Sequence, residues 1–218
     1  PLVRLKIAAS LDGRTAMASG ESQWITGDAA REDVQRLRAS SGVVLSGINT
    51  VIADNPSLTV RDMTLADGAL QPLRVIVDST LRMPPSARML SLPGETLIFC
   101  IADENRPPLE DHGAEVVMVQ AQEGRPDLRM VLEALANRDI NDVLVEAGPT
   151  LSGSLLAAGL VDELVIYQAP HIMGSETRGM VMTPTWHALD QRLELEILDT
   201  RNIGADMRIT ARPKKQIS

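Results

Sequence analysis

The sequence predicts an α/β fold with a mainly parallel central sheet and a C-terminal antiparallel hairpin. Short apolar runs of strand length alternate with helical patterns along the chain, which is typical of layered α/β proteins. Several of these runs are apolar throughout, as expected of strands that are buried on both faces. With 218 residues, 44% of them hydrophobic, the chain is long enough for a substantial core, and we expect a single domain over residues 1–218.

The strands are predicted at the apolar runs, which lie between clusters of turn-forming residues. In chain order these runs are Val3–Ala9, Val43–Gly47, Arg74–Asp78, Thr96–Ile101, Glu115–Val119, Asp142–Glu146 and Glu163–Gln168. Loops are expected over Asp62–Pro72 and Ala102–Gly113, because both segments are rich in turn formers.

The clearest predicted helix covers Asp28–Ala39. Its acidic side chains fall early and its basic side chains fall late, as the helix dipole favours, and Gly42 supplies a stop. Two further helices are predicted over Leu128–Asn137 and Leu151–Ala158. Near the C-terminus, polar and apolar residues alternate on both sides of residues 202–204, which predicts an antiparallel hairpin that closes the sheet.

Composition and charge argue against several classes of protein. A net charge of −8 argues against a nucleic-acid-binding surface, which needs an excess of Lys and Arg, but a few arginines can still bind an anionic small molecule. No stretch approaches the ~20 apolar residues of a membrane span, and Pro1–Arg4 shows no signal peptide. We therefore expect a cytoplasmic protein without nucleic-acid or membrane partners.

The sequence also argues against metal and thiol chemistry. The single cysteine, Cys100, excludes an internal disulfide and a multi-thiolate metal site, and its apolar neighbours predict a buried, inert thiol. The histidines His112, His171 and His187 lack the spacing of metal ligands, so no metal site is expected. The chain contains neither the P-loop pattern nor the usual glycine pattern of a dinucleotide-binding turn.

Three segments that follow predicted strands are candidates for the functional site. Residues 146–154 open a helix with small residues, which can bind a pyrophosphate or simply form a strand-to-helix turn. Residues 46–61 are either a solvated loop or a polar site, with Thr50 and Asp54 one helical turn apart. Residues 8–26 lead to Trp24, which either covers a ligand or packs on the core. We expect the three segments to converge at the carboxyl ends of the strands.

Four motifs occur in order along the chain: LKIAASLDGRTA at residues 5–16, GESQWIT at 20–26, ADNPSLTVR at 53–61 and VEAGPT at 145–150. Together they resemble the reductase half of the bifunctional riboflavin-biosynthesis deaminase/reductase. This resemblance implies a dihydrofolate-reductase-like three-layer fold and a homodimer. It also implies the NADPH-dependent reduction of 5-amino-6-(5-phosphoribosylamino)uracil to the ribitylamino compound.

The start at Pro1 suggests a piece of a longer bifunctional chain. A chain with one cysteine cannot supply the zinc signature of the partner deaminase, so an N-terminal deaminase domain would lie outside residues 1–218. A stand-alone reductase is the alternative.

The resemblance further implies roles for individual residues. The substrate would contact Ser22, Arg38, Leu58, Arg61 and Glu146, with the two arginines as candidates for its phosphate, because guanidinium groups bind phosphate well. The cofactor would contact Ala8, Trp24, Thr50, Asp54 and Ser79, with its pyrophosphate on Gly148, Pro149, Thr150, Leu151, Ser152, Gly153 and Ser154.

The ionisable candidates for catalysis are Lys6, Asp54 and Glu146, of which Lys6 or Glu146 is expected to donate the proton that accompanies hydride transfer. Asp12 is expected to be structural and to fix the turn at residues 11–13. Three other activities stay open. They are a dihydrofolate reductase, which the scarcity of aromatic residues disfavours, a related reductase that acts before deamination, and a non-catalytic nucleotide-binding domain.

Overall fold

The computed structural model describes residues 1–61 and 71–214, which form two compact units. Unit 1 contains Pro1 and Gln35–Glu146, and unit 2 contains Leu2–Val34 and Ala147–Ser218. One boundary falls inside helix α1 (Asp28–Ala39), whose two ends match the prediction.

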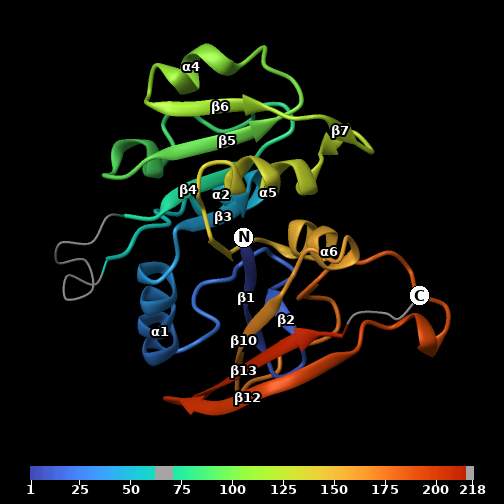
Figure 1. Cartoon of the computed structure of the whole chain (residues 1–218). Coiled ribbons are helices and arrows are strands. Elements are labelled where there is room, and N and C mark those ends of the chain that lie inside the picture. Colours follow the sequence, from blue (N-terminus) through green and yellow to red (C-terminus); the bar gives the residue numbers. More distant parts are fainter. Residues whose placement is uncertain (62–70, 215–218) are drawn as a thin grey trace. The chain divides into compact units, whose positions relative to one another are not determined.

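Unit 1 is built on a parallel sheet with the strand order β9, β3, β4, β5, β6. Figure 1 labels the strands from β3 to β6. Every side chain of β5 is buried, whereas in β6, at the edge of the sheet, only Ala114 and Val116 are buried. The centre of this sheet is therefore covered on both faces, as its continuous apolar runs predicted. The strands are β3 (Val43–Gly47), β4 (Leu73–Val77), β5 (Thr96–Cys100), β6 (Ala114–Met118) and β9 (Asp142–Val145).

Short helices and turns connect these strands. One of them, α4, lies within residues 102–113, so the prediction of a loop there is wrong. Proline is common in loops, but it also fits the first turn of a helix, where its missing N–H has no partner to lose, and Pro107 and Pro108 lie in that turn of α4. The connecting elements are α2 (Ile48–Asp54), η1 (Arg88–Ser91), α4 (Arg106–Glu110), β7 (Ala121–Gln122), β8 (Arg125–Pro126) and α5 (Leu128–Ala136).

Unit 2 contains a mixed sheet with the strand order β12, β13, β10, β1. Strands β1 (Leu2–Ser10) and β10 (Glu163–Ala169) are parallel, and β10 pairs in the antiparallel sense with β13 (Asp206–Pro213). Strand β12 (Leu195–Ile203) completes an antiparallel hairpin with β13, which confirms the predicted C-terminal hairpin (Figure 1).

Three smaller elements complete unit 2. The helix predicted over Leu151–Ala158 begins earlier, because Pro149 suits the first helical position. The elements are α6 (Pro149–Ala157), η2 (Leu189–Gln191) and a two-stranded antiparallel sheet of β2 (Arg14–Ala16) and β11 (Arg178–Gly179). Residues 62–70, within the loop predicted over Asp62–Pro72, lie outside the described residues.

A buried polar cluster anchors the first part of α1 in unit 2. The Tyr167 hydroxyl donates a hydrogen bond of 2.6 Å to Asp33 Oδ2, and Arg208 Nη1 donates one of 2.8 Å to the same oxygen. Tyr167 is completely buried on β10, and Arg208 lies on β13. The Asp33 carboxylate therefore ties the helix to two strands, a role beyond the dipole interaction that its position in the helix predicted.

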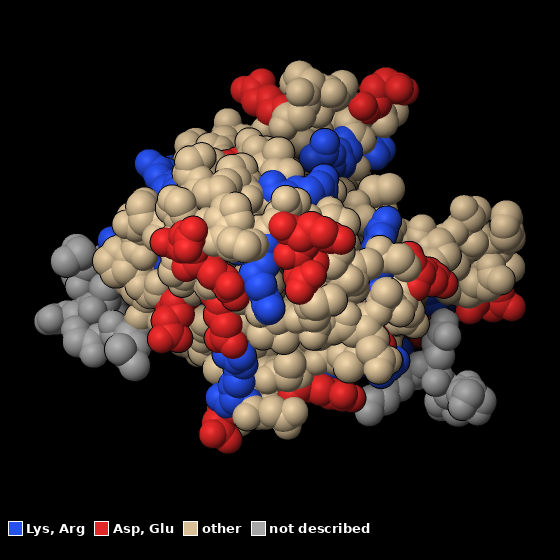
Figure 2. Space-filling model, turned by 90° about the horizontal axis from the view of Figure 1, so that it is seen from above, with Lys and Arg blue, Asp and Glu red and all other residues tan. Residues whose placement is uncertain are grey.

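The described part of the chain contains no helix that is long and apolar enough to cross a lipid bilayer. Cys100 is buried at the end of β5, as predicted. On the face of the molecule drawn in Figure 2, acidic and basic side chains lie interspersed among uncharged ones.

Candidate functional site

The predicted site residues divide between the two units. Several follow the carboxyl ends of strands, where ligands of α/β proteins bind. Glu146, for example, comes directly after β9, and its backbone N–H donates to the Leu45 carbonyl of β3 at 2.9 Å. Unit 1 holds Arg38, Thr50, Asp54, Leu58, Arg61, Ser79 and Glu146, and unit 2 holds Lys6, Ala8, Ser22, Trp24 and residues 148–154.

The centre of the candidate site in unit 1 is an ion pair between Arg38 and Glu146. Arg38 Nε lies 2.6 Å from Glu146 Oε1, and Nη2 lies 3.1 Å from Oε2, so the pair is bidentate. Arg38 Nη1 donates to the Thr59 carbonyl at 2.9 Å. The two side chains are only 11% and 9% exposed. Burial by itself lowers the pKa of Arg38, but the charge and hydrogen bonds of Glu146 outweigh burial, and the pKa is raised.

This ion pair changes the interpretation of two predicted site residues. Arg38 was expected to offer its guanidinium to a sugar phosphate, but all three of its nitrogens bind Glu146 or Thr59. Glu146 was a candidate proton donor, but a carboxylate that compensates a buried guanidinium is costly to neutralise. The geometry therefore favours a positioned carboxylate at Glu146 and leaves Arg61 as the stronger candidate for the phosphate.

The segment that leads to Arg61 is held in a fixed conformation. Leu58 is buried and adopts a left-handed backbone conformation with φ of 51°. The Arg61 N–H donates to Gln35 Oε1 of α1 at 2.7 Å, and the Val60 N–H donates to Gln71 Oε1 at 2.8 Å. These bonds fix the backbone from which the Arg61 side chain projects.

Helix α2 carries Thr50 and Asp54. Because they are four residues apart, they lie on the same face of this helix, one turn apart as expected, although no helix was predicted for these residues. The helix ends at Asn55, a left-handed C-cap whose side-chain oxygen accepts the Arg88 N–H at 2.8 Å. Asn tolerates this backbone conformation better than most residues, which accounts for Asn at the end of α2.

The turn after β4 carries Ser79 and is shaped by Asp78, a residue that sequence analysis did not single out. Asp78 is completely buried, and its Oδ2 accepts the Met83 N–H at 2.8 Å. Across this turn, Arg82 Nη2 donates to Asn49 Oδ1 of α2 at 2.9 Å. A carboxylate that closes a turn on a backbone amide holds Ser79 in a defined place.

In unit 2, Lys6 and Ala8 lie on the same face of β1. The odd-numbered residues of this strand are buried from Val3 to Ala9, and the even-numbered ones between them are half-buried. Trp24 is 63% exposed in the loop before α1, and the Arg31 guanidinium lies 4.7 Å from the centre of its ring. An exposed indole ordered by a stacked arginine agrees better with the ligand-covering interpretation than with packing on the core.

The residues predicted to bind the pyrophosphate differ in their exposure. Gly148, the N-cap of α6, has extended backbone angles, and Thr150 and Leu151 beside it are half-buried. Ser152 and Gly153 are buried, and the Ser152 hydroxyl donates to the Ala147 carbonyl at 3.3 Å. The start of α6 can thus accommodate an anion on its first-turn amides, whereas Ser152 interacts with the chain itself.

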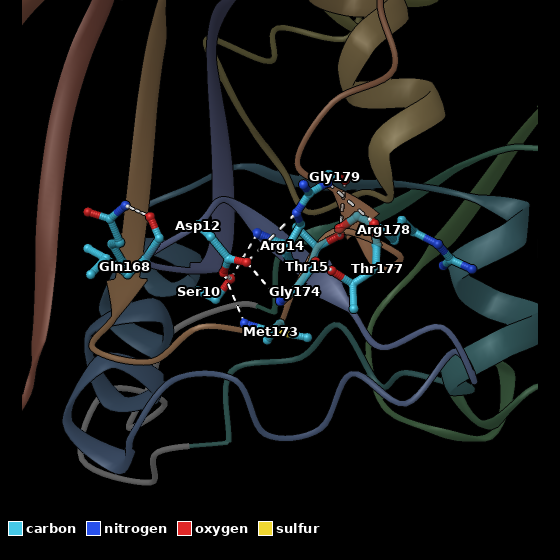
Figure 3. A network of polar contacts seen from close by, with 11 residues as sticks. Ser10, Asp12, Arg14, Thr15, Gln168, Met173, Gly174, Thr177, Arg178 and Gly179 are labelled. Carbon is cyan, nitrogen blue, oxygen red and sulfur yellow. Dashed lines mark hydrogen bonds and ion pairs between the residues drawn. The ribbon is translucent and has the colours of Figure 1, made fainter.

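Asp12 fixes more than the turn for which it was expected. It accepts hydrogen bonds from the Ser10 hydroxyl at 2.5 Å and from the N–H groups of Met173 and Gly174 at 3.0 and 2.8 Å (Figure 3). The bond from Ser10, followed by that from Met173, lowers the pKa of Asp12 to about 2. The sequence could reveal the turn but not the distant amides.

No group of three or more His, Cys, Asp and Glu side chains within the described ranges is arranged to hold a metal ion.

Comparison with known proteins shows which family this chain is similar to. Residues 1–209 match the family model of the RibD C-terminal domain. The riboflavin biosynthesis protein RibD of Escherichia coli (strain K12) is 42% identical over 216 residues, which are 95% of this chain and 58% of that protein. The 5-amino-6-(5-phosphoribosylamino)uracil reductase of Buchnera aphidicola (subsp. Acyrthosiphon pisum) is 34% identical over 208 residues, 91% of this chain and 100% of that protein.

Solved structures agree with the predicted fold. Acinetobacter baumannii RibD, form 2, has a TM-score of 0.88 and 41% identity, with 98% of this chain and 58% of that chain covered. A dihydrofolate reductase from Enterococcus faecalis has a TM-score of 0.50 over 98% of this chain and 97% of that chain. At 13% identity this second likeness concerns the fold alone. The dihydrofolate-reductase-like fold is therefore confirmed, and the chain spans about 58% of the length of the RibD proteins.

Proposed function

Because this chain belongs to the RibD C-terminal domain family, we propose that it reduces 5-amino-6-(5-phosphoribosylamino)uracil to its ribitylamino product with NADPH, in riboflavin biosynthesis. The observation that carries the proposal is the match to the Buchnera reductase, which is named for this substrate and is covered over its whole length. Since the RibD proteins extend beyond the matched region, we also propose that a deaminase domain accompanies this one. The homodimer implied by the resemblance stays a prediction, which sedimentation equilibrium can test.

In unit 1, Glu146 and Arg61 would bind the substrate. Arg38, which is itself held by the Thr59 carbonyl, fixes the Glu146 carboxylate in one orientation. An oriented carboxylate can accept hydrogen bonds from a pyrimidine or a sugar hydroxyl. Arg61, on its fixed backbone, would pair with the phosphate. Ser22 and Leu58 complete the proposed substrate contacts.

The start of α6 in unit 2 would hold the pyrophosphate of the cofactor. The start of α6, where Gly148, Thr150 and Leu151 are half-buried and Pro149 is buried, suits a pyrophosphate, because small residues let it approach the backbone amides. The family resemblance further gives Ala8, Trp24, Thr50, Asp54 and Ser79 as candidate contacts of the dinucleotide.

Reduction of the ribosyl group breaks the bond between C1 and the ring oxygen of the sugar, which gives an open-chain imine and a hydroxyl group. A hydride then adds to C1 of the imine, and a proton adds to its nitrogen. Bound NADPH supplies the hydride. We assign the proton to Lys6, since its ammonium group is a hydrogen-bond donor only and lies on the half-buried face of β1. Glu146 would orient the substrate, because it already serves as the partner of Arg38.

The test is the disappearance of NADPH absorbance with the purified domain and the phosphorylated pyrimidine, before and after deamination of its ring. We expect faster turnover with the deaminated compound. Faster turnover with the compound that still carries the amino group would indicate the related reductase that acts before deamination. No turnover with either, alongside tight NADPH binding, would indicate a non-catalytic domain.

A further inference from the structure

One segment of unit 2 is held at both ends by parts of the candidate site. Residues 170–183 follow β10, contain β11 and end beside α6. At one end the segment binds the turn after β1, and at the other it lies on the helix proposed to bind the pyrophosphate. Neither contact could be inferred from the sequence, because the partners are 29 or more residues apart along the chain in each case.

The first anchor is Asp12. Its two carboxylate oxygens each accept one backbone N–H of the segment, from Met173 and Gly174. The adjacent backbone adds a bond of 2.9 Å from the Leu11 N–H to the His171 carbonyl. Hydrogen bonds to an ionised acceptor are stronger than those to a neutral one, so the charge of Asp12 contributes to the hold on this end.

The middle of the segment pairs with the strand that leaves the same turn. Strand β11 pairs in the antiparallel sense with β2, with Arg178 opposite Ala16 and Gly179 opposite Arg14. The Thr15 hydroxyl lies 3.3 Å from the Gly179 carbonyl (Figure 3). The segment is thus guided from the Asp12 turn toward α6 by a short sheet.

The second anchor is Gly153 of α6. A Cβ atom at this position would lie 1.8 Å from the Met182 carbonyl oxygen and 2.9 Å from its nitrogen, so the backbone of the segment fills the place of a side chain. The Met182 N–H also donates to the Pro149 carbonyl at 2.9 Å, and the Thr150 hydroxyl lies 3.6 Å from Met182 Sδ. Met182 therefore contacts both the first turn of α6 and its middle.

We propose that Asp12 and Gly153 are positioning residues, and that through residues 170–183 they hold the first turn of α6 in the orientation that binds the cofactor. The identity of the cofactor, NADPH, rests on the proposed function. Gly153 would then be required as the seat of the Met182 backbone rather than as a contact of the pyrophosphate, which is the role that the family resemblance implied.

The variants Gly153→Ala and Asp12→Asn test the proposal, with Gly179→Ala as the matched control. A Cβ atom on Gly179 would meet only the end of the Arg14 side chain, at 4.0 Å, so this glycine in the same segment tolerates a methyl group. Calorimetry gives the Kd of NADPH, steady-state kinetics give kcat and both KM values, and hydrogen exchange reports the amides of Met173, Gly174 and Met182.

We expect Gly153→Ala to weaken NADPH binding about tenfold or more, because the Met182 backbone must move. Asp12→Asn should weaken it about threefold or more, since the amide group of Asn cannot accept both N–H groups. For both variants, kcat at saturating NADPH and the KM for the pyrimidine should stay within about twofold of the wild type, and Met182 should lose protection from exchange. Gly179→Ala should match the wild type.

The two proposals fail in different ways. If Gly153→Ala does not fold, Asp12→Asn still tests the positioning role. The Asp12 side chain is partly exposed and binds the end of the segment that is far from α6, so its replacement should leave the protein folded. An Asp12→Asn variant with faster exchange at Met173 but wild-type affinity for NADPH would overturn the positioning role. The proposed function alone would be overturned by a different result. In that result the wild type binds NADPH more tightly than Asp12→Asn, as predicted, but does not reduce the pyrimidine.

Discussion

The two units each contain a carboxylate that organises part of the candidate site, but the two carboxylates differ in exposure and in the groups that bind them. Glu146 in unit 1 is 9% exposed and is neutralised by one guanidinium. Asp12 in unit 2 is 23% exposed and is held by a hydroxyl group and two backbone N–H groups, while Arg14 Nε lies farther away, at 4.0 Å. Removing one member of a buried ion pair lowers the free energy of unfolding strongly, because a buried charge is left uncompensated. Removing one of several hydrogen bonds to a carboxylate lowers it less. The two units should therefore respond differently to mutation and to acid.

The largest expected effect is on the stability of unit 1. Replacing Arg38 with Met leaves Glu146 buried without its counter-charge, which should lower the free energy of unfolding by about 3–5 kcal/mol in urea titrations at neutral pH. Arg138→Met is the control, because its pair with Glu115 is largely exposed and should contribute no more than about 1 kcal/mol. The double variant Arg38→Met, Glu146→Leu should recover most of the loss, and a failure to do so would contradict the ion-pair explanation.

The second effect separates proton transfer from positioning. Lys6→Met should lower kcat at least about tenfold at saturating NADPH, because the proposed proton donor is lost. Glu146→Gln should mainly raise the KM for the pyrimidine, because an oriented acceptor is lost. If Glu146→Gln instead lowers kcat as much as Lys6→Met does, the ion pair does not prevent Glu146 from acting as the acid.

The third effect distinguishes the two arginines of unit 1. Arg61→Ala should raise the KM for the phosphorylated pyrimidine about tenfold, since a charge-assisted contact to phosphate is removed. The same variant should leave the KM for the dephosphorylated compound unchanged, which provides an internal control. Equal effects on both compounds would remove Arg61 from the phosphate site.

The smallest effect is the acid sensitivity of unit 2. The pKa of Asp12 is lowered from 3.8 to about 2 by folding, so its carboxylate stabilises the folded state above pH 4, and this contribution is lost as the pH falls through 2. The difference in unfolding free energy between wild type and Asp12→Asn should therefore be constant near neutral pH and shrink below pH 4. Urea titrations from pH 7 to pH 2 measure it, and a difference that grows in acid would refute the assignment.

The strands and the main helix could be predicted because their evidence is local. The apolar run of β3 and the charge order of α1 each lie within a single element, and both were predicted with the observed bounds. Helix α4 was not predicted, because proline is favourable in the first turn of a helix but disrupts its middle. Its two prolines lie in the first turn.

The contacts that organise the site could not be predicted, because they depend on pairings between distant residues. Arg38 and Glu146 were both named as substrate contacts, yet their mutual ion pair spans 108 positions in the chain. Asp12 was assigned to its own turn, and nothing in the local sequence pointed to the amides of Met173 and Gly174, which lie 161 and 162 positions away.

The seat of Met182 on Gly153 has a consequence for redesigning nucleotide preference. A glycine that a family resemblance assigns to the pyrophosphate invites substitution when the ligand is to be changed, but here any side chain would collide with the protein's own main chain. Libraries aimed at a different nucleotide should keep this position invariant and vary its more exposed neighbours, Thr150 and Leu151. Sequence comparisons should likewise find the glycine retained in relatives that have stopped using a dinucleotide, as long as they keep this packing.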